Sequence, residues 1–161
     1  MTSPTPLILG EFRRALDERY RLSLPAELLE PLVGKVNDCI LAKESPGALS
    51  LWSAAAWKAN LESGMELVER KIQSGRLHGQ IEEVQRLGRL LSTRHRAVQI
   101  AGKGRLLIPE GFREFLGVEP SGDVLLVGAA VCVEIWRPDA WLDYLKENMP
   151  HFRKLFDNLS G

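Results

Sequence analysis

The chain contains the same phrase twice. The segment RLSLPAELLE at residues 21–30 returns as RLLIPEGFRE at residues 105–114, 84 residues later. The same offset aligns the four tryptophans of the chain in two pairs, Trp52 with Trp136 and Trp57 with Trp141. Two copies are too few for a solenoid, whose repeats stack in series. The sequence therefore predicts a duplicated module with approximate two-fold symmetry.

Each copy is predicted to contain four strands. Period-2 alternation of apolar residues, interrupted by turn residues, predicts them. They are FRRAL, a strand with Leu22 and Leu24, CILAK and ALSLW in the first copy, and AVQIA, a strand with Leu106 and Ile108, DVLLVG and VCVEIW in the second. A four-stranded sheet of this size cannot bury both of its faces alone. We therefore expect the two copies to interlock into one barrel-like body of the α+β class, with a mainly β core.

Proline and glycine mark the predicted helices. Pro25 and Pro109 suit the first turn of a helix, where the missing N–H costs nothing, and Gly34 and Gly117 suit its C-terminal end. A further helix closes each copy, after Ser53 in the first and from RPDAW, with Pro138 at its start, in the second. Residues 12–57 and 97–141 are thus expected to form the same β–β–α–β–β unit, with Trp52 and Trp136 in equivalent places.

The segment between the copies has a helical pattern. Apolar residues recur at helical spacing at Leu77, Ile81, Val84, Leu87 and Leu91, and QSGRLHG divides the segment into two helices. We expect this stripe to pack on the body or on a neighbouring subunit. The resulting division is module 1 at 8–61, a helical connector at 62–95, module 2 at 96–146 and a C-terminal tail at 147–161.

Basic residues gather beside the repeated phrase, although the net charge of the chain is zero. Between Val84 and Pro109 there is no acidic residue, and six cations occur there: Arg86, Arg89, Arg94, Arg96, Lys103 and Arg105. Near the first phrase the cations are Arg13, Arg14, Arg19 and Arg21. Cations two residues apart at a strand start share one face, which suits a phosphate backbone. The alternative is an ordinary solvated face.

Other classes of protein find little support in the sequence. The N-terminus lacks the pattern of a signal peptide, and no stretch has the length and apolarity of a membrane span. AGKG lacks the Ser/Thr that follows the lysine of a phosphate-binding loop, because Gly104 stands there. The three histidines have no metal-like spacing, and Cys39 and Cys132 are expected to be buried thiols. We expect no enzyme, metal or cofactor, and no small-molecule substrate.

Three segments resemble the MraZ family. GEFRRALDERYRLSLPAEL at residues 10–28 is similar to its N-terminal signature, in which L-D-x-K-G-R leads into an apolar proline phrase. IAGKGRLLIPEGFREFLGV at residues 100–118 resembles the second copy, and DVLLVGAAVCVEIWRPDAW at residues 123–141 resembles the closing strands and helix. Tyr20 stands where the first motif has Gly, and Ala101 where the second has Asp. Because Tyr adopts a positive φ only at a cost, the first loop is expected to differ in shape, with Tyr20 packed inward.

The resemblance implies two tandem SpoVT/AbrB-like swapped-hairpin modules that form a pseudo-symmetric barrel, with helices between and after them. It implies a DNA-binding regulator, cytoplasmic and nucleoid-associated, that binds direct repeats upstream of the division and cell-wall gene cluster as a homo-oligomeric ring, commonly as a repressor. By position, Arg19 and Lys103 match the motif lysine, and Arg21 and Arg105 match its terminal arginine. With Arg13 and Arg14 these are the candidate DNA-binding residues. The alternative is a protein-binding antitoxin or assembly hub of AbrB type that has lost DNA binding.

Overall fold

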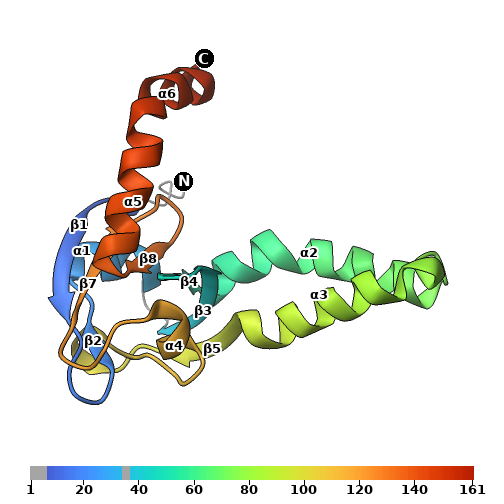
Figure 1. The fold of residues 1–161 in the computed structure, drawn as a ribbon, viewed down its shortest axis with the longest axis horizontal. Helices are drawn as coiled ribbons and strands as arrows, with labels where there is room; N and C mark the ends of the chain where they lie inside the picture. Colours follow the sequence, from blue (N-terminus) through green and yellow to red (C-terminus); the bar gives the residue numbers. More distant parts are fainter. Residues whose placement is uncertain (1–6, 34–36) are drawn as a thin grey trace, which may run out of the picture.

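The fold consists of a six-stranded antiparallel sheet, a separate two-stranded ribbon, and helices that extend away from both (Figure 1). The structure, a computed structural model, describes residues 7–33 and 37–161, apart from the side chains of residues 62 and 63. The large sheet has the order β1-β7-β8-β4-β3-β5. Its strands are β1 (Glu11–Ala15), β3 (Asp38–Ser45), β4 (Ala48–Ser53), β5 (His95–Gln99), β7 (Asp123–Gly128) and β8 (Val133–Trp136). The chain is therefore α+β with a mainly antiparallel β core, as predicted.

The strand order reads the same from both ends once the 84-residue offset is applied. Strand β1 of the first copy pairs with β7 of the second, and β5 of the second copy pairs with β3 of the first. At the centre of the sheet, Ser50 of β4 lies opposite Glu134 of β8. These two residues are equivalent positions of the two copies, 84 residues apart. The two copies thus exchange their first strands around a pseudo-two-fold axis, which explains why neither copy can bury its sheet alone. Within the described residues no pairing joins β1 to β5, so the closed barrel stays a prediction.

The repeated phrase forms the two-stranded ribbon. Its strands are β2 (Arg21–Ser23) and β6 (Arg105–Leu107), which run antiparallel. Leu22 lies opposite Leu106, its repeat equivalent, and both side chains are buried. A pseudo-two-fold axis therefore passes between Leu22 and Leu106 in the ribbon, as one passes between Ser50 and Glu134 in the large sheet.

The helices begin largely where the sequence predicts. Ser53 caps α2 (Ala54–Gln73) through its hydroxyl, and α5 (Pro138–Asn148) starts at its proline. Helix α1 (Ala26–Val33) follows Pro25 directly, whereas α4 (Phe112–Leu116) begins three residues after Pro109 and ends at Gly117, which is left-handed. Gly34 lies outside the described residues. The remaining helices are α3 (Ile81–Arg94), α6 (Phe152–Ser160) and the single turns η1 (His78–Gln80), η2 (Gly102–Gly104) and η3 (Met149–His151).

The core lies between the large sheet, the ribbon and the short helices α1 and α4. Leucine and isoleucine side chains from both copies meet there, including Leu28 of α1 and Leu116 of α4. The two cysteines are free and buried, as predicted. Burial raises the pKa of the Cys39 thiol to about 11 and that of Cys132 to about 12, because a thiolate is poorly solvated there.

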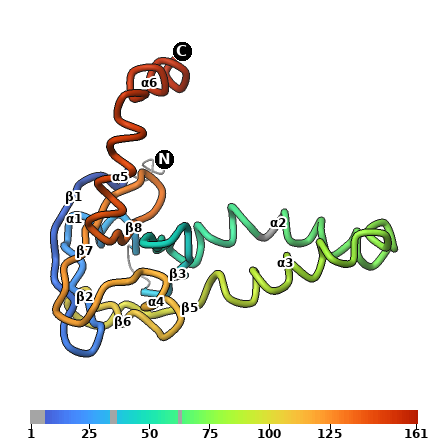
Figure 2. The backbone as a smooth tube through the Cα atoms, in the orientation of Figure 1, coloured from blue at the N-terminus to red at the C-terminus, as the bar shows by residue number. Residues whose placement is uncertain are grey.

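Two helical extensions leave this body in different directions (Figures 1 and 2). Helices α2 and α3 form a long antiparallel hairpin, which we call the arm, and QSGRLHG lies at its turn as predicted. Helices α5 and α6 carry the C-terminus away from the sheet. The apolar stripe of α3 faces α2 rather than the sheet, because Leu87 and Leu91 line a groove with Met65 and Val68. Of the two expected positions, packing on the body is not what Leu87 and Leu91 show, and packing on a neighbouring subunit stays a prediction.

Candidate nucleic-acid interface

Each strand of the ribbon is preceded by a tight loop. We call residues 17–20 the first loop and residues 101–104 the second loop. In the first loop the Asp17 N–H donates to the Arg21 carbonyl at 3.0 Å, and the Tyr20 N–H donates to the Asp17 carbonyl at 3.1 Å. In the second loop the Ala101 N–H donates to the Arg105 carbonyl at 2.9 Å, and the Gly104 N–H donates to the Ala101 carbonyl at 3.2 Å. The two loops therefore share one hydrogen-bond frame.

Tyr20 adopts nearly the same backbone conformation as Gly104, its equivalent in the second copy. Its φ is +60°, and that of the equivalent Gly104 is +73°. The loops differ at the residue before, since Lys103 is also left-handed at +65° whereas Arg19 does not have a positive φ. The first loop was expected to differ in shape from the second. The difference is confined to the backbone of Arg19, and the hydrogen bonds that the two loops share are unchanged.

Each loop is anchored by a backbone hydrogen bond from the other copy of the repeat. The Ile108 N–H donates to the Tyr20 carbonyl, and the Leu24 N–H donates to the Gly104 carbonyl, both at 2.9 Å. These two bonds are repeat equivalents, so they tie both ends of the ribbon in the same way. Each loop is therefore positioned by the residue that follows the ribbon strand of the other copy, and not by its own sequence neighbours alone.

The Tyr20 side chain packs inward, as the sequence favoured. It is half-buried against the hydrophobic core, and the Cζ atom of Arg113 lies 4.3 Å from the centre of its ring. Sequence reasoning did not find Arg113, whose repeat equivalent is the apolar Leu29. The sequence feature that could have pointed to this contact is the arginine within RLLIPEGFRE, where the first copy of the phrase has leucine.

Asp17 orders the first loop. One oxygen of its carboxylate accepts from the N–H groups of Arg19 and Arg21, and the other accepts from Nε of Arg21 at 2.7 Å. The backbone N–H of Arg21, and then its guanidinium, lower the pKa of this carboxyl. Ala101 occupies the equivalent place in the second loop and offers no carboxylate, so the Arg105 side chain has no such tether.

The ribbon brings two predicted residues together. Because Leu22 and Leu106 point into the core, Arg21 and Arg105 lie on the opposite, exposed face. Arg21 pairs with Leu107 and Arg105 with Ser23, which makes the two arginines diagonal neighbours with Cα atoms about 7–8 Å apart. We call the exposed surface of the ribbon that carries these two arginines the arginine face.

The other four candidates lie around this face. Arg19 and Lys103 occupy the two loops, which precede antiparallel strands and therefore lie at opposite ends of the ribbon. Arg13 and Arg14 lie on β1, an outer strand of the large sheet. Arg13 forms an exposed ion pair with Asp123 at 2.9 Å, so part of its charge is neutralised. The structure thus joins Arg21 with Arg105 and leaves β1 on a separate sheet.

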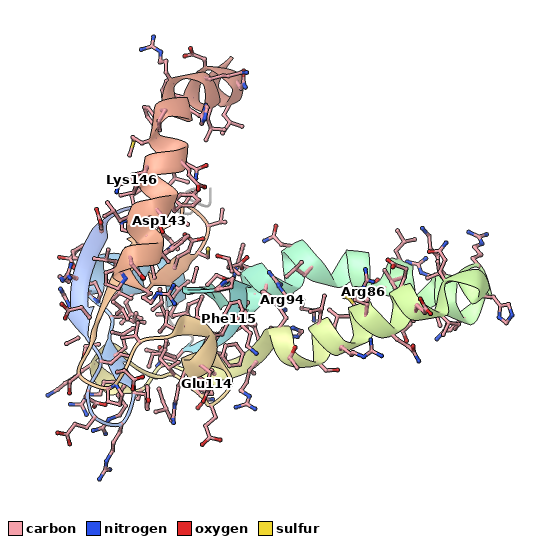
Figure 3. The ribbon with its side chains drawn as sticks, in the orientation of Figure 1. Arg86, Arg94, Glu114, Phe115, Asp143 and Lys146 are labelled. Atoms are coloured by element: carbon pink, nitrogen blue, oxygen red, sulfur yellow. The ribbon has the colours of Figure 1, made fainter. Side chains whose placement is uncertain are left out.

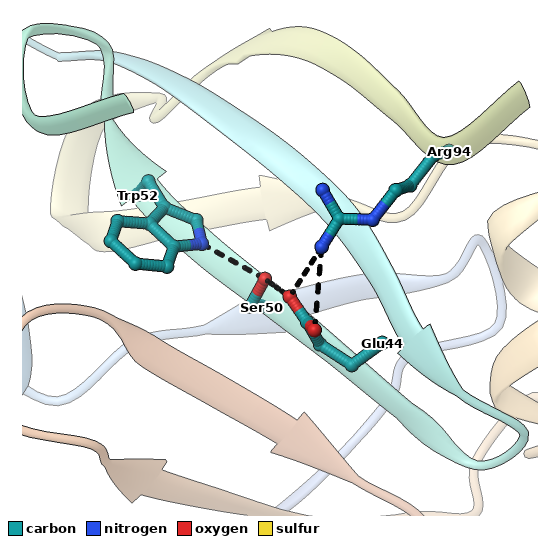
Figure 4. A network of polar contacts seen from close by, with 4 residues as sticks. All are labelled: Glu44, Ser50, Trp52 and Arg94. Carbon is teal, nitrogen blue, oxygen red and sulfur yellow. Dashed lines mark hydrogen bonds and ion pairs between the residues drawn. The ribbon is translucent and has the colours of Figure 1, made fainter. Parts of the chain in front are cut away.

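Part of the basic cluster in the connector is engaged elsewhere. Arg94, at the root of the arm, lies 3.2 Å from Glu44, which also accepts a hydrogen bond from Ser50 (Figure 4). Arg86 lies farther along the arm and pairs with Glu83 (Figure 3). The absence of acidic residues from the sequence between 84 and 109 therefore did not reveal that Arg94 has an acidic partner 50 residues away.

Neither a metal centre nor a membrane segment emerges from the part of the chain that the structure describes. No group of three His, Cys, Asp or Glu side chains lies close enough there to hold a metal ion. None of its helices combines the length and the apolarity needed to cross a membrane. The chemistry that the site offers is cationic hydrogen bonding.

The comparisons with known proteins point to one family. A family described as "MraZ protein, putative antitoxin-like" matches residues 93–159. The "Transcriptional regulator MraZ" of Acetivibrio thermocellus is 30% identical over 144 residues, covering 89% of this chain and 90% of that protein. The chain belongs to the MraZ family. The family member of the same name from Syntrophomonas wolfei is 26% identical and covers 95% of this chain and 96% of its own length.

A solved structure is less informative about the family. The solution structure of a protein from Pyrococcus horikoshii aligns with 81% of this chain and 90% of its own, at 10% identity and a TM-score of 0.31. A similarity of this size carries no argument about fold or function. The assignment to the MraZ family therefore rests on sequence, and both relatives span the two copies of the repeat.

Proposed function

We propose that this protein is a DNA-binding transcriptional regulator that contacts double-stranded DNA through the arginine face. The observation that supports this proposal most directly is the opposition of Leu22 and Leu106, which turns Arg21 and Arg105 outward on one surface. Guanidinium groups bind phosphate oxygens and guanine edges through paired N–H donors. The relatives named as transcriptional regulators lend the proposal its biological context.

In this proposal the two loops have different roles. Asp17 holds Arg21 in one orientation, which suits a contact to a base edge, whereas the untethered Arg105 suits a phosphate. Arg19 and Lys103 extend the cationic surface along the ribbon, and Arg13 and Arg14 add charge from β1. Modules at 8–61 and 96–146 would be the DNA-binding units, with 62–95 as connector and 147–161 as tail. Helix α2 runs without interruption across the boundary at residue 62.

The finer part of the proposal concerns assembly and target. One arginine face carries few cations and the chain has no net charge, so several copies are needed for tight binding. We propose a homo-oligomeric ring that repeats the arginine face over direct repeats upstream of the division and cell-wall gene cluster, with repression as the outcome. Such a protein would act in the cytoplasm, at the nucleoid.

The experiment is a titration of DNA from upstream of this gene with the purified protein, followed by fluorescence anisotropy. Tight binding to that DNA, and much weaker binding to a shuffled duplex of equal length, is the expected result. Equal affinity for both duplexes would contradict sequence-specific regulation. The second candidate, a protein-binding antitoxin or assembly hub, is favoured by the exposed apolar helices and by the family description. It predicts no DNA binding and a change in size with a protein partner.

A further inference from the structure

The arm has no core of its own. None of the described side chains of α2 or α3 is buried, and the two helices face each other across an apolar groove of about 400 Å³. Most of its lining is apolar and comes from Trp57, Leu61, Met65, Val68, Leu87 and Leu91, and Lys58, Gly64, Arg94 and His95 complete it. Two helices that leave a gap between their apolar stripes have the geometry of a helical bundle from which one helix is missing. The arm therefore offers an apolar surface on which a further helix could pack.

Helix α6 has the complementary feature. Phe152, Leu155, Phe156 and Leu159 follow the spacing i, i+3, i+4, i+7, and between 56% and 80% of each residue is exposed. This spacing is the anchor pattern of a helix that lies in a groove. The opposite side of α6 carries Lys154 and Asp157. One side of the helix is therefore suited to a hydrophobic partner and the other to water.

The two features cannot meet within one chain. Helix α6 lies beyond the end of α5, on a different side of the body from the arm, and the two are far apart (Figure 1). Contact between them requires two molecules. The α6 of one copy then fills the arm of the next, which leaves the α6 of the second copy free for a third. Such a head-to-tail contact closes into a ring when the rotation between copies permits.

We infer that the arm groove is the docking site for α6 of a second copy of this chain. The exposed apolar area of α6 is about 500 Å² if each of its four anchors has a full area near 200 Å². With the groove and the flanking side chains, one contact would bury roughly 1,000 Å², the lower limit for a specific interface. Each member of a ring makes two such contacts. The inference rests on the ring in the proposed function but does not depend on DNA binding.

The first test measures size by light scattering at micromolar concentration. The variant Phe156→Glu/Leu159→Glu removes the apolar side of α6, and Leu61→Glu/Met65→Glu charges the groove at side chains that are more than one-third exposed. Lys154→Glu and Arg70→Glu are the matched controls, on the outer sides of α6 and α2. We expect the wild type and both controls to be oligomers and both double variants to be folded monomers by circular dichroism.

Mixing the two double variants decides between docking partners. Each retains one intact surface, so the mixture should form a one-to-one dimer and nothing larger. A dimer of either double variant by itself would mean that α6 pairs with α6 or arm with arm, and two monomers that stay apart on mixing would mean that α6 does not dock in the arm. Each of these results overturns the inference. An α6 variant that assembles like the wild type overturns it as well, but leaves the ring in place. A monomeric wild type would contradict both the ring and the docking.

A crosslink tests the contact directly. Met65→Cys and Leu159→Cys place one thiol on each surface, and the native Cys39 and Cys132 are buried. Under mild oxidation the double-cysteine chain should form a ladder of disulfide-linked oligomers, and the single-cysteine chains should remain unlinked. Dimers of the Leu159→Cys chain alone would show pairing of α6 with α6 and would overturn the assignment. This readout does not require that the docking variants fold.

Discussion

The guanidinium of Arg113 stacks over the ring of Tyr20, with its Cζ atom 4.3 Å from the ring centre. The two residues belong to different copies of the repeat. Nε of Arg113 also donates to the Ile108 carbonyl at 2.6 Å, and the Ile108 N–H donates to the Tyr20 carbonyl. Tyr20 is left-handed, a conformation that is unfavourable for a residue with a side chain. The contact with Arg113 therefore offsets the cost of placing tyrosine where the second copy has Gly104.

Replacing Arg113 should weaken the fold. Arg113→Ala removes the stacking contact and the hydrogen bond to Ile108, and we expect the free energy of unfolding to fall by about 1–2 kcal/mol. Urea denaturation followed by tryptophan fluorescence measures this loss. Arg113→Lys, which retains the charge but not the planar group, should lie between alanine and wild type. An unchanged midpoint in Arg113→Ala would mean that Tyr20 is held by burial alone.

Replacing Arg21 should weaken DNA binding and leave the fold intact. Arg21→Ala should cost about 1–3 kcal/mol of binding free energy per site if the contact is to a base, and should flatten the salt dependence if it is to phosphate. Arg105→Ala should have the smaller effect, because no carboxylate orients it. The measurements are DNA titration at two salt concentrations, thermal melting and light scattering.

Arg96→Ala is the control for that experiment, since Arg96 is an exposed cation on β5, outside the ribbon. Equal losses in Arg21→Ala and Arg96→Ala would indicate a diffuse field rather than a site. Unchanged binding in Arg21→Ala would remove the arginine face from the mechanism and favour the protein-partner function.

Asp17 should make stability depend on acid pH. Its pKa is lowered in the folded protein, first by the Arg21 backbone N–H, so the unfolded chain binds a proton more readily. The contribution of Asp17 is therefore present above its unfolded pKa, near 3.8, and is lost as the pH falls through its lower folded pKa. Denaturation of the wild type and of Asp17→Asn between pH 3 and pH 7 should give curves that converge at the acid end. Parallel curves would contradict a role for the ionised carboxylate in the loop.

Gly104 should tolerate no side chain. Its φ is +73°, and an added Cβ would lie 2.9 Å from the Leu24 carbonyl oxygen and 3.0 Å from a methyl of Leu29. We expect Gly104→Ala to lower the free energy of unfolding by about 1–3 kcal/mol. Gly102→Ala is the matched control in the same loop, because an added Cβ there meets nothing within 4 Å. Equal melting temperatures for the two variants would show that the second loop can relax around a Cβ.

Much of this protein could be predicted from the sequence, because the signals are local. The 84-residue offset, the alternation around Leu22 and Leu106, the cap at Ser53 and the proline at 138 depend only on backbone preferences and on neighbours close in the chain. They sufficed for the duplicated design, the α+β class and the candidate status of Arg21 and Arg105. The sequence left the position of the α3 stripe open between the body and a neighbouring subunit, because an apolar stripe does not specify which surface covers it.

The tertiary structure decided what depends on contacts between distant residues. The exchange of first strands between copies, the partnership of Glu44 with Arg94 and the stack of Arg113 on Tyr20 join residues that no local pattern connects. Local preferences select helices and strands, but the pairing of strands and charges is set by the packing of the whole chain. The sequence therefore determined which residues could form a cationic face, and only the antiparallel pairing of β2 with β6 brought Arg21 and Arg105 onto one surface.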